Sequence, residues 1–185
     1  MEIIDGPGIL SKPARHYVGI RVVTPFRGMF AVRDELMNEL YTWLDKRSVS
    51  DTGPTFFRLH VIDMDGPMDV EVGVVTQETL EGDDRVRAGV LPAGRYASLT
   101  YVNHARRANR TLVEWARDNG IAFDRWDEPA GDHFACRYEA YLTDPRSERM
   151  KTRWRVELSI LTAENPPPHP ACPTEKTRVS NRPDR

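Results

Sequence analysis

The chain repeats its own pattern, and this repeat constrains the fold more than any other feature. The segment PARHYVGI from Pro13 aligns with PAGRYASL from Pro92, with Pro, Ala and Tyr at matching places. Each segment is followed by an amphipathic stretch typical of a helix, and these stretches end alike in LYTWLDKRSV and LVEWARDNGI. Asn119 and Gly120 add the stop signal expected at a helix C-terminus. After the helices, FRLHVIDMD from Phe57 aligns with YEAYLTDPR from Tyr138, and VEVGVVT aligns with VELSILT. The order strand, helix, strand, strand therefore occurs twice.

Neither copy of this unit can form a stable core alone, because three strands covered by one helix bury too little apolar surface. We expect the halves, residues 13–77 and 92–163, to pack about a pseudo-two-fold axis, with antiparallel sheets and a ligand cleft between them. The predicted fold class is α+β, a tandem duplication of strand-helix-strand-strand units. Trp43 and Trp115 are expected to be equivalent core residues. Short matches of Val, Leu and Thr arise by chance in antiparallel sheets, but three matched segments in one order favour duplication.

Composition is that of an ordinary single-domain globular protein, with 39% hydrophobic and 29% charged residues among 185. The net charge is -2, and Lys and Arg are scattered among Asp and Glu, so direct nucleic-acid binding is not expected. The start MEIIDGPGIL lacks the pattern of a signal peptide, and no segment approaches membrane-spanning length. We therefore expect a cytoplasmic protein that does not bind membranes.

The composition changes after residue 164, where four prolines occur within NPPPHP and little is apolar. This predicts a folded domain over residues 1–164 and a flexible proline-rich tail over residues 165–185. Cys136 lies in an alternating apolar segment and is expected to be a reduced core residue, whereas Cys172 lies in the tail. Neither has metal-ligand spacing with the five histidines, so no metal or other cofactor is expected.

Strand parity predicts which side chains face a ligand cleft, because successive side chains point to opposite faces of a sheet. In the last strand of each half, alternate apolar residues face the helix, which leaves Glu71 and Glu157 at equivalent positions on the other face. The alignment of Phe57 with Tyr138 places both rings against the helices. The residues then expected to face the ligand are Glu71, Glu157, His60, Glu139, Tyr141 and Tyr96.

The second half carries a long insertion, IAFDRWDEPAGDH, between Gly120 and Phe134. The matching turn of the first half, near Gly53, is far shorter, and extra loop length beside a cleft is often functional. Trp126 in this insertion is a candidate for closing over a ligand. The alternative is that Trp126 only anchors the loop.

Two interpretations of the acidic residues remain open. A carboxylate such as Glu157 in an aromatic, partly dry cleft can hold an organic cation, with cation-π attraction from the rings. A carboxylate on a sheet surface is, however, more often solvated or paired with an arginine, for which Arg58 and Arg155 are candidates. Glu139 can instead anchor a structural hydrogen bond, and a lone histidine such as His60 is more often packed or solvated than catalytic.

Four segments together carry a family resemblance: LPAGRYASL from Leu91, NRTLVEW from Asn109, YEAYLTDP from Tyr138 and WRVELSI from Trp154. Over roughly residues 13–163 the chain resembles the GyrI-like small-molecule-binding family. This family includes the effector-binding domains of multidrug-responsive bacterial transcription regulators. The chain resembles a stand-alone branch, because it shows no helix-turn-helix partner domain.

The resemblance implies a duplicated α+β fold whose central cleft binds bulky aromatic compounds, many of them cationic. It implies that Glu157, in the last strand, is the acid that faces the ligand. Family members commonly have a Gly-Pro-Tyr-like turn after the first strand of the second half, whereas this chain has YVNH from Tyr101. A pocket contact made through that family tyrosine is therefore not carried over.

Three functions compete at this point. The leading hypothesis is a binding module that senses or sequesters hydrophobic, including cationic, drugs or metabolites. The alternative is a hydrolase that opens the cyclopropane rings of DNA-alkylating natural products, because some stand-alone members are described so. In that enzyme, Glu157 would position or activate water, with a nearby tyrosine as acid. A protein partner, such as a gyrase modulator, is the third hypothesis, and no surface feature of the sequence supports it.

Overall fold

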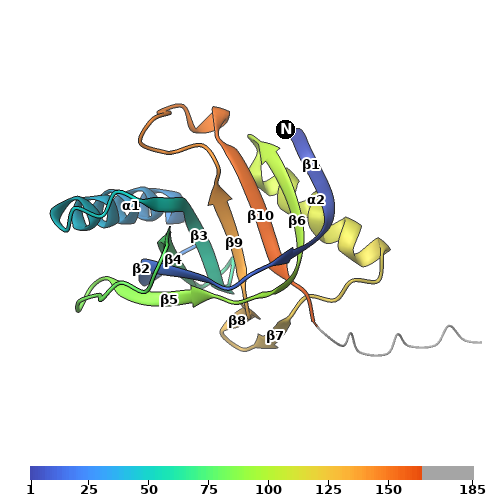
Figure 1. The fold of residues 1–185 in the computed structure, drawn as a ribbon. Coiled ribbons are helices and arrows are strands. Elements are labelled where there is room, and N and C mark those ends of the chain that lie inside the picture. The colour runs from blue at the N-terminus through green and yellow to red at the C-terminus, as the bar shows by residue number, and fades with distance from the viewer. Residues whose placement is uncertain (164–185) are drawn as a thin grey trace, which may run out of the picture.

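The computed structural model of the protein describes residues 1–163, which form two helices and ten strands joined in one open antiparallel sheet (Figure 1). The helices are α1 (Met29–Lys46) and α2 (Ala105–Asp118), and a short 3-10 turn, η1, covers Lys151–Arg153. The strands are β1 (Glu2–Lys12), β2 (Arg15–Pro25), β3 (Thr52–Ile62), β4 (Pro67–Thr76), β5 (Arg87–Leu91), β6 (Gly94–Val102), β7 (Arg125–Glu128), β8 (Gly131–Phe134), β9 (Arg137–Tyr141) and β10 (Arg155–Leu161). The predicted tail, residues 165–185, and Cys172 lie outside the described residues.

The strand order confirms the duplication. It runs β1-β6-β10-β9-β3-β4-β2-β5, with the β7–β8 hairpin attached to β3. The predicted repeat corresponds to β2-α1-β3-β4 and β6-α2-β9-β10. When each strand is replaced by its counterpart in the other unit, and β1 and β5 are exchanged, the same strand order is obtained in reverse. Since β9 and β3 of different halves pair at the centre, the two units share a continuous sheet.

Two strands outside the predicted repeat link the halves further. β1 precedes the first half but pairs with β6 of the second, where Gly8 lies opposite Ser98. β5 precedes the second half but pairs with β2 of the first, where Gly89 lies opposite Tyr17. Each half thus adds its leading strand to the sheet of the other half.

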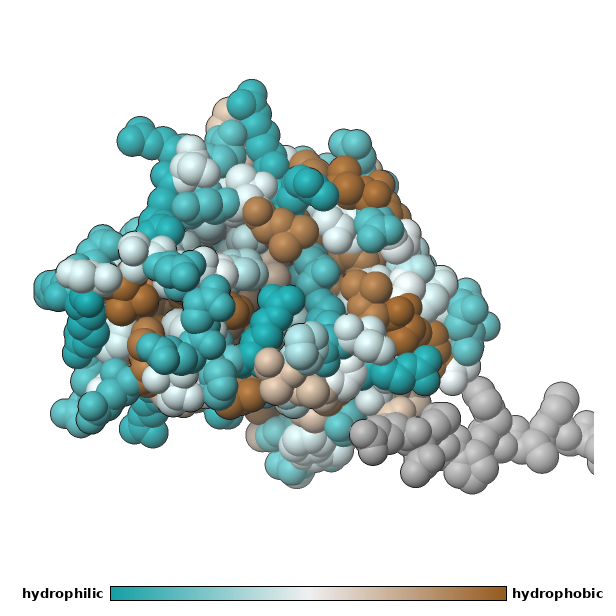
Figure 2. All heavy atoms as spheres, viewed as in Figure 1, coloured by the Kyte–Doolittle hydropathy of each residue, from teal (hydrophilic) through white to brown (hydrophobic). Residues whose placement is uncertain are grey.

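Both helices cover one face of this sheet. The cross-strand pairs Val72 with Phe57, Phe57 with Glu139 and Glu139 with Leu158 place these four residues on a single face. α1 packs over β2 and β4, and α2 packs over β6 and β1. The main hydrophobic core lies between the helices and this face. On the side seen in Figure 2, hydrophobic residues appear only as separate patches among hydrophilic ones.

The helices end alike but begin differently. α2 ends at Asp118, and Gly120 then adopts a left-handed φ of 65°, which confirms the stop predicted at Asn119–Gly120. α1 has 18 residues and α2 has 14. Because LYTWLDKRSV and LVEWARDNGI match at the C-terminal ends, the additional turn lies at the start of α1. Trp43 is a core residue as predicted, whereas Trp115 is only partly buried against the core.

The opposite face of the sheet carries a second, aromatic cluster. Its members are Tyr17, Phe56, Leu91, Tyr96, Cys136, Tyr138 and Ala140. Phe56 makes edge-to-face contacts with Tyr17 and Tyr138, at ring-centre distances of 5.0 and 5.9 Å. The Phe56 ring also covers Gly73, where a Cβ atom would lie 2.2 Å from a ring carbon, so only glycine fits there. Cys136 is buried in this cluster with a free thiol, as expected.

The predicted faces were right for the strands of the repeat except β9. Val72 pairs with Phe57, and its counterpart Leu158 pairs with Glu139. Phe57 therefore matches Glu139 and not Tyr138, so the sequence alignment of this segment was wrong by one residue. A shift of one residue moves every side chain of a strand to the other face. Glu139 and Tyr141 consequently lie beneath the helices, and Tyr138 lies on the opposite face.

Candidate functional site

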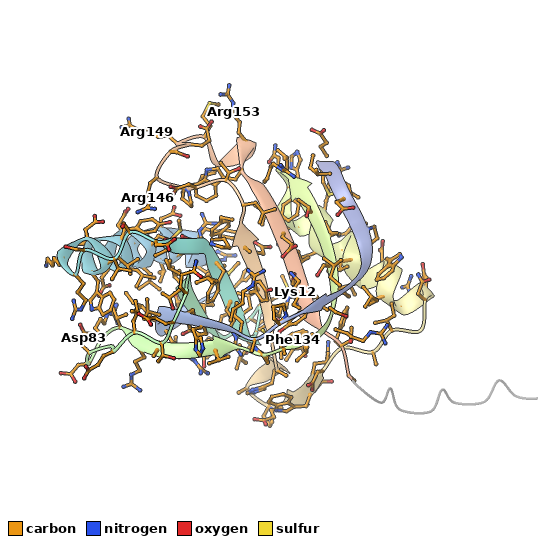
Figure 3. The ribbon with its side chains drawn as sticks, viewed as in Figure 1. Lys12, Asp83, Phe134, Arg146, Arg149 and Arg153 are labelled. Atoms are coloured by element: carbon orange, nitrogen blue, oxygen red, sulfur yellow. The ribbon has the colours of Figure 1, made fainter. Side chains whose placement is uncertain are left out.

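A cavity of about 320 Å³ lies on the helix-covered face, between the start of α1 and the start of α2. Both halves build it: α1 supplies its first turns, and the second half supplies β6, β9 and the η1 segment. The side chains central to its chemistry are Phe30, Arg33, Tyr101, Glu139, Tyr141 and Trp154. The connection between β9 and β10 borders the cavity through Lys151 and Thr152, while its Arg149 and Arg153 point outward (Figure 3). This is the cleft between the repeats.

Glu139 places a buried carboxylate at this cavity, with only 8% of the residue exposed. Asn109 of α2 donates a hydrogen bond of 3.0 Å to Glu139 Oε1, and accepts one of 2.6 Å from Arg137 Nη2. Within residues 1–163 no lysine, arginine or histidine forms a salt bridge with Glu139. Burial, reinforced by the Glu139 carboxylate, raises the pKa of the neighbouring Tyr101 hydroxyl well above its usual value. The carboxylate is therefore held by neutral groups and lacks a direct counter-ion.

Arg137 lies behind this site and does not neutralise it directly. Its guanidinium reaches Asn109, and burial lowers its pKa to about 10. The Arg137 Nε atom has no hydrogen-bond partner among the described residues. The predicted alternative for Glu139, a structural hydrogen bond, is also present, since the Asn109 contact ties β9 to α2.

Arg33 lies over the aromatic side of the same cavity. Its guanidinium carbon is 5.0, 5.6 and 5.8 Å from the ring centres of Phe30, Tyr141 and Trp154. Arg33 Nη1 donates a hydrogen bond of 3.2 Å to the Tyr141 hydroxyl, and Nη2 pairs with Asp34 at 2.7 Å. The cavity thus contains an aromatic surface that already holds a cation.

Glu157 lies on the opposite face, apart from Tyr141, which corrects the predicted single site. It pairs with Lys12 of β1, whose Nζ also donates a hydrogen bond of 2.9 Å to Ser159. The same Nζ is 5.8 Å from the ring centre of Tyr96 and 5.5 Å from that of Tyr138. Figure 3 shows Lys12 over the middle strands, well apart from the β9–β10 connection. Burial lowers the pKa of the Lys12 ammonium, although Glu157 opposes this shift.

Glu71 and His60 also lie on the opposite face, where Glu71 occupies the position equivalent to Glu157. Glu71 Oε2 is 2.7 Å from His60 Nε2 and accepts a hydrogen bond of 3.1 Å from the Tyr17 hydroxyl. These residues, with Arg58, line a second and more polar cavity of about 630 Å³. The equivalence of the two glutamates is as predicted, but neither lies in the cleft between the helices.

Trp126 does not close over either cavity. The insertion forms the β7–β8 hairpin. β8 pairs with the C-terminal end of β3, where His133 lies opposite Val61. Trp126 is 47% exposed and stacks on His133 at 5.4 Å, while its Nε1 donates to Glu128 at 2.9 Å. Trp126 therefore anchors the hairpin, which is the predicted alternative, and it lines neither of these two cavities.

Comparison with known proteins identifies the family. The profile of the GyrI-like small molecule binding domain matches residues 7–161. The chain belongs to this family. A search of curated proteins found no match to this GyrI-like chain.

Solved structures share the GyrI-like fold. EcmrR in complex with DNA has a TM-score of 0.65 at 15% identity, covering 84% of this chain and 56% of that one. The isolated C-terminal domain of EcmrR has a TM-score of 0.60 at 14% identity, covering 84% and 96%. A structure described as a hydrolase from Listeria innocua has a TM-score of 0.55 at 13% identity, covering 84% and 91%.

SAV2435, solved with tetraphenylphosphonium, has a TM-score of 0.52 at 11% identity, covering 89% of this chain and 95% of that one. At such identities, these likenesses establish the fold alone. This GyrI-like chain spans little more than half of the DNA-bound EcmrR chain, and nearly all of the isolated EcmrR C-terminal domain.

Two further properties bear on what the GyrI-like domain can hold. Within residues 1–163, no group of three or more His, Cys, Asp or Glu side chains is arranged to bind a metal ion. Neither described helix is long and apolar enough to cross a membrane.

Parity alone did not single out Arg33, Asn109 and Tyr101 of this GyrI-like domain as cavity residues. Asn109 carries a signal that could have found it: with the helices aligned at their C-terminal ends, it takes the place of Met37, a core residue of α1. Arg33 corresponds to Ala105, the first residue of α2, so no repeat match points to it.

Proposed function

We propose that this GyrI-like domain binds bulky aromatic small molecules, with a preference for cations, in the cavity between α1 and α2. The observation that carries the proposal is Glu139: a buried carboxylate that forms no salt bridge within residues 1–163, at the position where the first half has the core residue Phe57. An unpaired buried charge is costly to folding, so a protein that retains one commonly uses it. A ligand cation beside Glu139 would offset that cost.

The surroundings of Glu139 support an aromatic ligand. Tyr141 and Trp154 lie with ring centres 5.1 Å apart, and Phe30 adds a third, partly exposed ring at the entrance. The cavity volume of about 320 Å³ lies within the range of small-molecule sites. The likeness to an effector-binding domain and to a protein solved with tetraphenylphosphonium is consistent with such a ligand.

A hydrolase that opens cyclopropane rings is the second candidate. The observation that favours it is the position of the Tyr101 hydroxyl in the same cavity as the Glu139 carboxylate, which puts a proton donor near a base. In this arrangement Glu139, rather than Glu157, would position water, because Glu157 is paired with Lys12 on the other face. A likeness to a hydrolase from Listeria innocua adds little, since it concerns the fold.

The test compares Glu139→Gln with Glu157→Gln, a matched change on the opposite face. Tetraphenylphosphonium and the neutral triphenylphosphine oxide are titrated against each protein and followed by tryptophan fluorescence. We expect Glu139→Gln to weaken the phosphonium by about 1 to 3 kcal/mol, or roughly 5- to 150-fold in Kd, and the neutral compound much less. Glu157→Gln should change neither Kd.

Other outcomes would redirect the proposal. Loss of phosphonium binding in Glu157→Gln alone would place the ligand on the opposite face. Equal losses for both compounds in Glu139→Gln would indicate a structural role for this carboxylate. A cyclopropane-bearing alkylator incubated with the protein and analysed by mass spectrometry addresses the enzyme: conversion that disappears in Glu139→Gln would favour the hydrolase.

A further inference from the structure

We propose that Arg33 is the resident cation of the cleft: in the free protein its guanidinium occupies the aromatic surface that a cationic ligand takes on binding. The ligand then exchanges with Arg33, and Arg33 sets which cations bind. This inference rests on the function proposed above and concerns the same cavity.

The geometry of Arg33 is that of a bound organic cation. Phe30, Tyr141 and Trp154 all have ring centres within 5.8 Å of its guanidinium carbon. Distances below about 6 Å give favourable cation-π attraction, which strengthens when the site is shielded from water. Arg33 is only 8% exposed, so the surface is largely shielded by the side chain itself.

The second half offers no equivalent cation. With the helices aligned at their C-terminal ends, Arg33 corresponds to Ala105, the first residue of α2. The two halves therefore share this helix position, but only the first half carries a cation there. Arg33 enters the cavity directly after the additional turn with which α1 begins.

Arg33 can leave the aromatic surface without losing its ion pair. Both Nε and Nη2 bond Asp34, at 3.1 and 2.7 Å, and the Asp34 side chain is 32% exposed. Lys151 pairs with the same carboxylate, which keeps that anion at the rim of the cavity. A guanidinium that moves outward with Asp34 gives up only the 3.2 Å bond to the Tyr141 hydroxyl and the contacts with the rings.

This exchange determines the class of ligand. A ligand must provide more contact with the three rings than Arg33 does, and its affinity is lowered by the fraction of protein in which Arg33 occupies the site. Delocalised cations with several aromatic groups meet this requirement. Small ammonium ions do not, since they bring a charge but little contact area. We therefore expect tetraphenylphosphonium to bind and tetramethylammonium not to bind.

The decisive variants are Arg33→Gln, which removes the charge, and Arg33→Lys, which keeps it. Kd values for tetraphenylphosphonium and triphenylphosphine oxide are measured by calorimetry, and folding of each variant is checked by thermal unfolding. We expect Arg33→Gln to tighten phosphonium binding about tenfold, with a smaller gain for the neutral compound, and Arg33→Lys to remain near the wild type. Lys12→Gln, which removes the cation held by Tyr96 and Tyr138 on the other face, is the control and should leave both Kd values unchanged.

Weaker or unchanged phosphonium binding in Arg33→Gln would overturn the exchange, and the proposed function would still stand if Glu139→Gln behaves as expected. If the phosphonium binds neither the wild type nor Arg33→Gln, both proposals fail. If Arg33→Gln does not fold, the exchange is tested by NMR on the wild type. The 15N-1H signal of Arg33 Nε is assigned by its loss in Arg33→Lys. The signal should shift on saturation with phosphonium, and an unchanged signal would overturn the inference.

Discussion

On the helix-covered face of the sheet, strand β3 of the first half carries Phe57 and Leu59. On the same face, the matched strand β9 of the second half carries Glu139 and Tyr141. The same contrast recurs on the first strand of each repeat unit, β2 and β6, and in the helix. The matched pairs are Phe57 and Glu139, Leu59 and Tyr141, Val22 and Tyr101, and Met37 and Asn109. One half fills the space under its helix with apolar side chains, and the other places polar groups there.

This difference shows how a duplicated fold can divide its tasks. The backbone frame is common to both halves, so the register of the strands is preserved even where side chains are not. The polar set costs stability unless its members satisfy one another, which Asn109 does for Glu139 through a hydrogen bond of 3.0 Å. The first half is thus the firmer part of the core, and the second half bears the candidate site.

The largest expected effect comes from giving the first half the polar residue of the second. Phe57→Glu would bury a charge among Val72 and other apolar residues of the main core. We expect a loss of at least about 4 kcal/mol in the free energy of unfolding, from lost packing and an unpaired charge together. Urea denaturation followed by circular dichroism measures it. The reciprocal change, Glu139→Phe, should cost little or add stability while removing phosphonium binding; equal damage from both changes would mean that the halves do not differ as described.

The tryptophans of the two helices sharpen the comparison. Trp43 is buried and its Nε1 donates a hydrogen bond of 2.5 Å to Asp83, whereas Trp115 is only partly buried. Trp43→Ala should cost about 3 to 5 kcal/mol and Trp115→Ala about 1 to 2 kcal/mol. Thermal and urea unfolding of both variants test this order. Equal costs would show that the helices are equivalent in packing, as the sequence pattern predicts.

A pH effect of intermediate size tests the buried tyrosines beside the candidate site. Burial raises the pKa values of Tyr101 and Tyr141 above the ordinary value of 10.0. Above pH 10 the unfolded chain releases phenolic protons that the folded protein keeps, so stability falls as pH rises, by up to about 1.4 kcal/mol per pH unit for each such tyrosine. Tyr101→Phe should reduce the loss measured between pH 9 and pH 11 by urea denaturation. An unchanged slope would mean that Tyr101 ionises freely in the folded protein.

The smallest effect is expected from the C-terminal residues, which belong to neither half. A chain that ends at Glu164 should unfold at the same temperature as the full chain, because the segment beginning NPPPHP has little apolar surface to contribute. Differential scanning calorimetry of both chains checks this prediction. A drop of several degrees would show that these residues stabilise the domain.

Much of the fold could be predicted from the sequence, because its signals are local. The apolar alternation that places Val72 and Leu158 on one face, and the Asn119–Gly120 helix stop, depend only on neighbouring residues. β1 could not be predicted in this way. Its strand pairs with β6, far along the chain, and its sequence carries the Gly-Pro pair of a turn.

The candidate site was harder to predict, because it depends on register. Glu139 and Tyr141, two of the predicted site residues, line one cavity. Their grouping with Glu157 was wrong. The apolar alternation of FRLH and YEAY looks alike even when the two segments are aligned one residue apart from their true match, and this shift inverts the predicted face of β9. Lys12 was not predicted to pair with Glu157, since the partner comes from the strand that the repeat did not include.

The exchange of β1 and β5 has a consequence for how such a protein could arise. A half-length chain with a leading strand, associated as a symmetric homodimer, would build the same sheet by swapping that strand between its two copies. In such a dimer any polar substitution under the helix would appear twice, and both copies would bear its cost. Joining the copies into one polypeptide removes that coupling. One copy can keep Phe57, which stabilises the core, while the other can carry Glu139 for the candidate site.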